Sequence, residues 1–164
     1  MHDMTKEISV GSAPLFHPGA GGVLGRIGSL EVRLARSAEE IEAAQQVRYR
    51  VFCEELGARC GLPMAGRDVD SFDEICDHII VCDGNLTGPD YKRVVGPYRL
   101  LRQERATPES GFYSASEFEF DRLIVNNPGL RFMELGRSCV LPPYRTKRTI
   151  EAMWQAIWTY VNHH

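Results

Sequence analysis

The feature that most constrains this chain is a strand-like segment, a Pro-Pro stop and an amphipathic helix in direct succession near its C-terminal end. The segment starting at Met133 mixes β-forming and small residues with two charges, and Pro142 and Pro143 then stop any ladder of strand hydrogen bonds. This order predicts a strand, a short basic turn and a helix over residues 147–161, whose N-terminal amides suit a phosphate. From spacing alone, an ordinary connection with solvated arginines is the better interpretation. The predicted helix carries an apolar stripe of Ile150, Met153, Trp154, Ile157 and Val161.

Composition excludes several classes of protein. The 164 residues suffice for one domain, and a net charge of −3 argues against nucleic acid as the main partner. Five cysteines without C-x-x-C spacing indicate neither a zinc ribbon nor a disulfide framework, so reduced thiols are expected. No metal site is predicted. The sequence has no apolar run of about 18 residues and no signal-peptide pattern, so we expect a cytoplasmic protein.

The order of predicted elements gives a mixed α/β plan with an antiparallel centre. Residues 1–28 are rich in glycine without periodicity and predict a flexible leader, which leaves residues 29–164 as the domain. Alternating residues 30–35 predict a strand, and the capping box of Ser37 and Glu40 starts a helix that ends near Gly57. Strands follow at residues 75–82 and 93–101 around a hairpin loop at 84–90, and a short helix is expected within 112–124.

Charged residues at two places need a separate interpretation. Arg48 falls on the apolar face of the first predicted helix, either as a functional group or as an arginine whose stem packs on the core. Residues 67–74 hold five charges in eight, which alone favours a solvated surface.

Six segments carry a recognisable pattern in this order: residues 47–52, 70–73, 76–78, 98–101, 134–140 and 143–145. Taken together, they resemble the GCN5-related N-acyltransferase (GNAT) fold and, within it, the L-ornithine N-alpha-acyltransferase (hemolysin-like) family, which makes lyso-ornithine lipid. Six charged positions in these segments are also similar to the pattern of acyl-homoserine-lactone synthases, which share the fold and the acyl carrier protein donor. These positions are Arg48, Asp70, Asp73, Arg99, Glu134 and Arg137.

The resemblance implies transfer of an acyl chain from a thioester to the α-amine of ornithine, the first step of ornithine lipid synthesis. Glu134 would act as the base, or position the amine through water, with Arg137 holding it. Strict alternation puts residues 134 and 137 on opposite faces, so their cooperation needs a β-bulge, for which Gly136 is suited. A structural ion pair is the simpler alternative.

The remaining expected roles concern the two substrates. Asp70 and Asp73 would bind the cationic end of ornithine, and Arg99 or Arg48 its carboxylate or a neighbouring acid. Backbone N–H groups near residues 138–140 would meet the oxyanion. Cys139 is expected to be a small buried residue and not a nucleophile.

The basic turn predicts the donor. Acetyl-CoA-dependent relatives carry glycines where this chain has Arg148 and Ile150, so a pyrophosphate cradle is not expected. Arg145, Lys147 and Arg148 suit instead the single phosphodiester and acidic surface of acyl carrier protein. We therefore expect no bound cofactor beyond the acyl-phosphopantetheine of the donor, and a peripheral membrane contact as a further partner.

The end of the chain gives a last expectation. In a fold of this kind the strand after the final helix forms a wall of the acyl slot, so the resemblance predicts a C-terminally truncated domain. A non-enzymatic alternative follows, in which a truncated domain binds acyl carrier protein without turnover.

Overall fold

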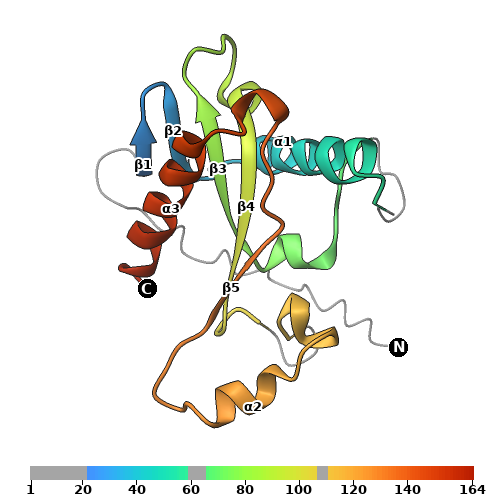
Figure 1. Ribbon diagram of the computed structural model, residues 1–164, viewed down its shortest axis with the longest axis vertical. Coiled ribbons are helices and arrows are strands. Elements are labelled where there is room, and N and C mark those ends of the chain that lie inside the picture. The colour runs from blue at the N-terminus through green and yellow to red at the C-terminus, as the bar shows by residue number, and fades with distance from the viewer. Residues whose placement is uncertain (1–21, 59–65, 107–110) are drawn as a thin grey trace, which may run out of the picture.

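The computed structural model describes residues 22–58, 66–106 and 111–164 as a five-stranded antiparallel sheet with a helix on each face (Figure 1). The two longer helices are α1, Ala38–Arg48, and α3, Lys147–Val161, and a short helix α2 spans Phe120–Val125. This architecture confirms the predicted α/β class. The strands follow their sheet order in sequence, as β1 (Val23–Ile27), β2 (Leu30–Leu34), β3 (Asp77–Asp83), β4 (Val94–Arg102) and β5 (Met133–Gly136).

Strand β3 shows why the sheet is covered on both sides. Its residues are almost all buried, and successive side chains of a strand point to opposite faces. Ile79 and Val81 pack in the cluster that contains α3, whereas Ile80 and Cys82 pack in the cluster that contains α1. The continuous apolar run of this strand therefore supplies both cores of a three-layer domain.

Strand β1 corrects the predicted leader, because residues 23–27 pair with β2 instead of forming a flexible segment. The glycine-rich sequence shows no strand pattern here, but close packing against α3 requires a glycine at position 25. A Cβ atom at Gly25 would lie 2.7 Å from the carbonyl oxygen of Ala152, so only glycine lets α3 approach so closely. Residues 1–21 of the expected leader lie outside the described residues.

Helix α1 begins as predicted, with the Ser37 side chain accepting from the N–H of Glu40. The Glu40 carboxylate, however, is buried and pairs with Arg33, so the predicted capping box is only half formed. The helix continues in π-helical winding over Tyr49–Glu55 and stops near Gly57, which has φ +69°. Arg48 is fully buried, which confirms that it points inward.

The connection between β4 and β5 forms a lobe below the sheet (Figure 1). The helix predicted within 112–124 is divided into a 3₁₀ turn at Tyr113–Ser116 and α2. Another 3₁₀ turn, Ser71–Glu74, lies in the charged run at 67–74. That run is not merely a solvated surface, because Asp68 is only 4% exposed.

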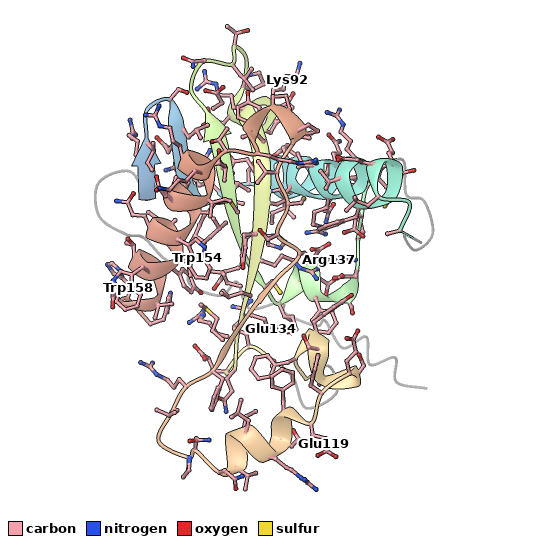
Figure 2. The ribbon with its side chains drawn as sticks, in the orientation of Figure 1. Lys92, Glu119, Glu134, Arg137, Trp154 and Trp158 are labelled. Carbon is pink, nitrogen blue, oxygen red and sulfur yellow. The ribbon has the colours of Figure 1, made fainter. Side chains whose placement is uncertain are left out.

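Helix α3 has a buried and an exposed apolar side. Of the predicted stripe, Met153 and Ile157 are buried against the sheet. The other three residues are exposed and are joined by Trp158, which points away from the sheet (Figure 2). Within the described ranges, no helix is long and apolar enough to cross a membrane. The exposed apolar side comprises Ile150, Trp154, Trp158 and Val161.

The cysteines differ in one respect from the expected reduced thiols. Cys76, Cys82 and Cys139 are free, as expected. Cys53, in the π-helical turn, takes part in a disulfide. Cysteine spacing alone did not indicate this bond.

Candidate active site

A one-residue bulge after β5 organises the candidate site. Gly136 lies opposite Arg99 of β4, and further along the same pair of strands Cys139 donates to the carbonyl of Pro97. The chain advances three residues from Gly136 to Cys139, while β4 advances only two from Arg99 to Pro97. One extra residue therefore lies between Gly136 and Cys139. The predicted bulge is therefore present, but the left-handed residue is Arg137, with φ +54°, and not Gly136.

The bulge turns Arg137 toward α1 and not toward Glu134. Its Nη2 donates to Asp68 at 3.1 Å. Its guanidinium carbon lies 5.4 Å from the ring centre of Phe52 and 5.8 Å from that of Tyr113. The two rings hold the cation through π contacts. The expectation that Arg137 holds Glu134 is wrong, since no ion pair joins these two described residues.

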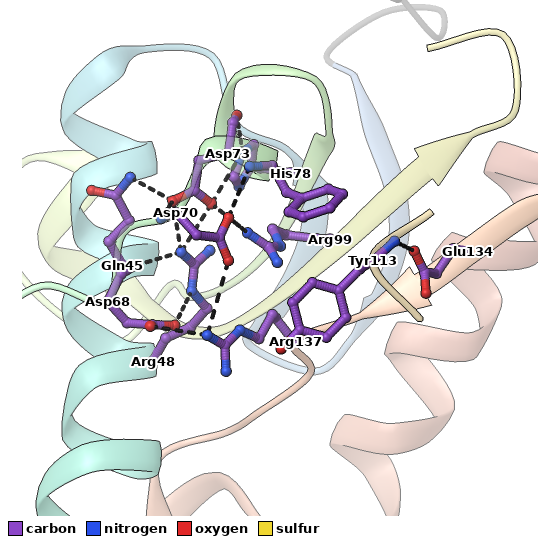
Figure 3. A network of polar contacts seen from close by, with 11 residues as sticks. Gln45, Arg48, Asp68, Asp70, Asp73, His78, Arg99, Tyr113, Glu134 and Arg137 are labelled. Atoms are coloured by element: carbon purple, nitrogen blue, oxygen red, sulfur yellow. Dashed lines mark hydrogen bonds and ion pairs between the residues drawn. The ribbon is translucent and has the colours of Figure 1, made fainter. Parts of the chain in front are cut away.

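Glu134 instead binds the 3₁₀ turn of the β4–β5 lobe. One carboxylate oxygen accepts the N–H of Tyr113 at 2.6 Å, and the other accepts the N–H of Ser114 at 2.9 Å and its hydroxyl. Figure 3 shows Glu134 beside Tyr113, with Arg137 on the far side of the tyrosine ring. Glu134 thereby fixes Tyr113 over Arg137.

Arg48 and Arg99 form the buried centre of an ion network with three aspartates (Figure 3). Arg48 donates from Nε to Asp68 at 3.0 Å and from Nη2 to both oxygens of Asp73 at 2.9 Å. Arg99 donates from Nη1 to Asp70 at 2.5 Å and to Asp73 at 3.0 Å. Each charge of this buried group has a partner of opposite sign, as burial requires.

The charges of the network oppose the effect of burial on its members. Burial alone would raise the pKa of Asp73, but hydrogen bonds and charges from Arg48 and Arg99 outweigh it and lower that pKa. Burial likewise acts to lower the pKa of Arg99, and the contacts with Asp70 and Asp73 raise it. Asp73 and Arg99 therefore stay ionised at neutral pH.

Exposure separates the members that a ligand can reach from those that it cannot. The side chains of Arg48, Arg99 and Asp73 are 0%, 3% and 7% exposed, so they are held by one another. Asp70 is 24% exposed, although its Oδ2 is buried without a hydrogen-bond partner and lies 3.9 Å from Nη2 of Arg137. Arg137 is 27% exposed. Two of the predicted substrate-binding residues, Arg48 and Arg99, are thus buried within the network, and Asp70 and Arg137 are its partly exposed members.

His78 supports the network through a hydrogen bond to the backbone of Asp73. Its Nε2 donates to the backbone carbonyl of Asp73 at 2.9 Å, while its Nδ1 is buried without a partner. Burial lowers the pKa of this imidazole, so it is neutral in the fold. A neutral ring with the proton on Nε2 fits this contact.

An apolar cleft of about 520 Å³ adjoins the bulge. Val51 and Phe52 line it from the π-helical turn, Ser138 and Val140 from the bulged strand, and Trp154 from α3. The cleft and the ion network therefore meet at consecutive residues, because Arg137 belongs to the network and Ser138 to the cleft. An apolar space of this kind suits an aliphatic ligand chain.

Backbone amides beside the cleft are available to a ligand. Cys139 and Leu141 donate to carbonyls of β4. The N–H groups of Ser138 and Val140, which alternate with those of Cys139 and Leu141 along the chain, donate to no described residue. The Cys139 side chain is buried, and burial raises the pKa of its thiol to about 12, which makes a thiolate nucleophile unfavourable, as expected.

The three basic residues predicted to meet the donor lie around the start of α3. Arg145 forms a bidentate pair with Glu55 at 2.5 and 2.6 Å and also lines the cleft. Lys147 is 89% exposed and lies 3.5 Å from Glu151. Arg148 is exposed. Lys147 and Arg148 are therefore the freer charges, and Arg145 chiefly joins the turn to the helix on the opposite wall.

Sequence reasoning missed Asp68, Tyr113 and Ser114. Asp68 lay in a charged run whose spacing gives no sign that one carboxylate is buried. A local pattern could have indicated the turn beside it, because Asp70 and Asp73 form the capping box of the 3₁₀ turn Ser71–Glu74. The role of Tyr113 and Ser114 depends on contacts about 20 residues apart in sequence, and no local pattern indicates it.

The antiparallel sheet, its two covering helices and the strand, bulge and helix beside an apolar cleft define a GNAT-like α/β domain. Residues 47–155 match the model of the acetyltransferase (GNAT) domain family, and the chain belongs to this family.

The chain is also similar to curated proteins. It is 59% identical over 148 residues to the L-ornithine N(alpha)-acyltransferase of Rhizobium meliloti (strain 1021), a match that covers 88% of this chain and 50% of the relative. It is 56% identical over 147 residues to the protein of the same name from Agrobacterium fabrum (strain C58 / ATCC 33970), covering 87% and 50%. The chain thus spans about half the length of these relatives.

A solved structure shares the fold. FeeM, an N-acyl amino acid synthase from uncultured soil microbes, matches with a TM-score of 0.59 at 14% identity. The match covers 82% of this chain and 65% of that chain. At this identity the likeness concerns the fold alone.

Proposed function

We propose that this domain transfers a fatty acyl chain from acyl carrier protein to the α-amine of ornithine, which begins the synthesis of ornithine lipid in the cytoplasm. The observation that carries the proposal is the junction of an apolar cleft with an ion network at Arg137 and Ser138. An acyl thioester in the cleft would bring its carbonyl beside a site that holds a charged amino acid. The names of the curated relatives support ornithine as that amino acid.

In the proposed reaction the amine nitrogen attacks the thioester carbonyl carbon, the C–S bond breaks, and the thiol of phosphopantetheine leaves with a proton. Glu134 takes the proton of the amine, directly or through a water molecule. Asp70, which is partly exposed, contributes its carboxylate to a cationic group of ornithine. The N–H groups of Ser138 and Val140 stabilise the oxyanion. Arg48, Arg99 and Asp73 keep Asp70 in place.

A peripheral membrane contact belongs to the same proposal, because the product is an amphiphile with one acyl chain. The exposed side of α3 supports it. Trp154 and Trp158 are 57% and 68% exposed there, and Lys147 and Arg148 lie at its start. Indole rings beside basic residues are typical of surfaces that lie on membranes.

The proposal is tested with acyl-acyl carrier protein and ornithine as substrates, and acyl-CoA as the competing donor. We expect the double variant Lys147→Glu/Arg148→Glu to raise the KM for acyl carrier protein about 10-fold or more at low salt, because the donor is acidic. Glutamate in the first turn suits the helix dipole, so the fold should persist. The matched control is Lys92→Glu/Arg122→Glu, which makes the same charge change elsewhere on the surface. Equal turnover with acyl-CoA would contradict the donor assignment, and lactone formation from S-adenosylmethionine would contradict the acceptor.

A further inference from the structure

Arg137 differs from the other arginines of the ion network in what remains free. Arg48 is fully buried, and so is the Nη1 that it leaves unpaired. Arg99 leaves Nε and Nη2 without a described partner, but its side chain is only 3% exposed. Arg137 is 27% exposed and uses Nη2 for its hydrogen bond to Asp68, while its Nε is buried without a partner. Its other terminal nitrogen, Nη1, donates to no described residue and is not among the buried unpaired atoms, so Arg137 presents the Nη1 end of its guanidinium to a ligand.

Two aromatic rings decide how that end can be used. Phe52 and Tyr113 each lie within 6 Å of the guanidinium of Arg137 and belong to the π-helical turn and the β4–β5 lobe. Tyr113 is itself fixed through its backbone by Glu134 and by an edge contact with Phe72 at 5.4 Å. Rings against the guanidinium leave its in-plane donors for recognition, and such donors match a carboxylate.

The surrounding charge defines the kind of ligand. Three arginines and three aspartates form the network, so the site as a whole is close to neutral. Asp70 Oδ2 lies 3.9 Å from Nη2 of Arg137 and would repel a lone carboxylate placed near it. A molecule that carries both an amine and a carboxylate pairs with both partly exposed side chains, Asp70 and Arg137, at once. A simple diamine or a simple carboxylic acid satisfies only one.

We infer that Arg137 is the carboxylate-binding residue of the acceptor site and selects amino acids over simple amines. The inference rests on the proposed function, because it names the subsite that the acceptor occupies. Tyr113 acts as a positioning residue, since it reaches the ligand through Arg137. The role expected for Arg48 or Arg99 thereby passes to the arginine with an accessible guanidinium end.

The test compares ornithine with 1,4-diaminobutane, which is ornithine without its carboxylate. The wild-type chain should prefer ornithine in kcat/KM by about 10- to 100-fold, the range of a charge-assisted hydrogen bond. Arg137→Gln should remove most of this preference, because kcat/KM for ornithine should fall by a much larger factor than kcat/KM for the diamine. Arg137→Lys keeps the positive charge but lacks the planar N–H donors of a guanidinium, so it should restore part of the preference for ornithine. Arg122→Gln, at an exposed arginine of α2, is the matched control.

A purely structural role predicts a different result. If Arg137 only stabilised Asp68, Arg137→Gln would reduce turnover of both acceptors by the same factor, and the inference would be overturned. Thermal melts show whether the variant is folded. Tyr113→Leu provides a second variant that leaves every charge in place, and it should raise the KM for ornithine more than that for the diamine. Equal effects on both acceptors would again overturn the inference.

Binding measured without a donor separates this inference from the proposed function. Titration calorimetry should show ornithine binding to the wild-type chain and at least 10-fold weaker binding to Arg137→Gln. Absence of acyl transfer to any amine, together with Arg137-dependent binding of ornithine, would refute the reaction and support the subsite. Ornithine binding that is the same in both chains would refute the subsite.

Discussion

At the scale of single residues, Asp70 and Asp73 have different positions although they are three residues apart and share one turn. Asp73 accepts hydrogen bonds from Gln45, Arg48 and Arg99 and is 7% exposed. Asp70 is 24% exposed and keeps one oxygen unpaired. The expectation of one shared role for both aspartates therefore needs revision. Asp73 holds the network together, and Asp70 is the more exposed of the two.

We predict that Asp73→Asn destabilises the domain by about 3–5 kcal/mol, because it removes the partner of two buried guanidinium groups. Asp70→Asn should cost far less stability and instead raise the KM for the acceptor about 10-fold or more. Denaturant unfolding and steady-state kinetics on both variants measure the difference. Equal stability of the two variants would contradict this division of roles.

At the scale of elements, the packing of α3 on the sheet depends on Gly25 of β1. Gly25→Ala places a methyl group 2.7 Å from the carbonyl oxygen of Ala152, a backbone atom that can move only with the helix. We expect a loss of about 1–3 kcal/mol in the free energy of unfolding. Gly129→Ala is the control, because a Cβ atom there meets nothing within 4 Å. A melt of Gly25→Ala that matches the control would show that the helix adjusts freely.

At the scale of the whole molecule, the pH dependence of stability should have two separate regions. Burial lowers the pKa of His78, so between that value and its ordinary value of 6.5 the unfolded chain binds more protons than the fold. Stability should thus be complete above about pH 6.5 and fall as the pH decreases below it. The lowered pKa of Asp73 acts only further down, below its ordinary value of 3.8.

Urea unfolding of wild type and His78→Gln between pH 7.5 and 5 measures the first region. Glutamine keeps an N–H for the carbonyl of Asp73 but cannot take a proton, so the slope of stability with pH should become smaller. A residual slope is expected from His164, whose pKa burial also lowers. An unchanged slope in His78→Gln would assign the acid sensitivity to other groups.

Patterns along the sequence predicted those features that depend on local periodicity. Alternation predicted the strand near residues 30–35, and richness in Val, Ile and Leu predicted those near 75–82 and 93–101. Helical spacing predicted the two long helices and the inward direction of Arg48. The structure confirms these features. Strand β1 was missed because Gly25 is present for close packing against Ala152, and such a contact leaves no apolar periodicity. The π-helical turn was missed because its sequence suits an α-helix equally well.

The sequence by itself determined the layers of this domain, because the continuous apolar run of β3 requires cover on both faces and the helical period of α3 supplies one such cover. It also determined which charged residues were candidates for the active site. Only the tertiary structure decided their partners. Glu134 binds the turn at Ser114, Asp68 joins Arg48 to Arg137, and an accessible guanidinium end remains on one arginine. These assignments depend on contacts across 20 to 69 residues of chain and on burial, which no local spacing encodes.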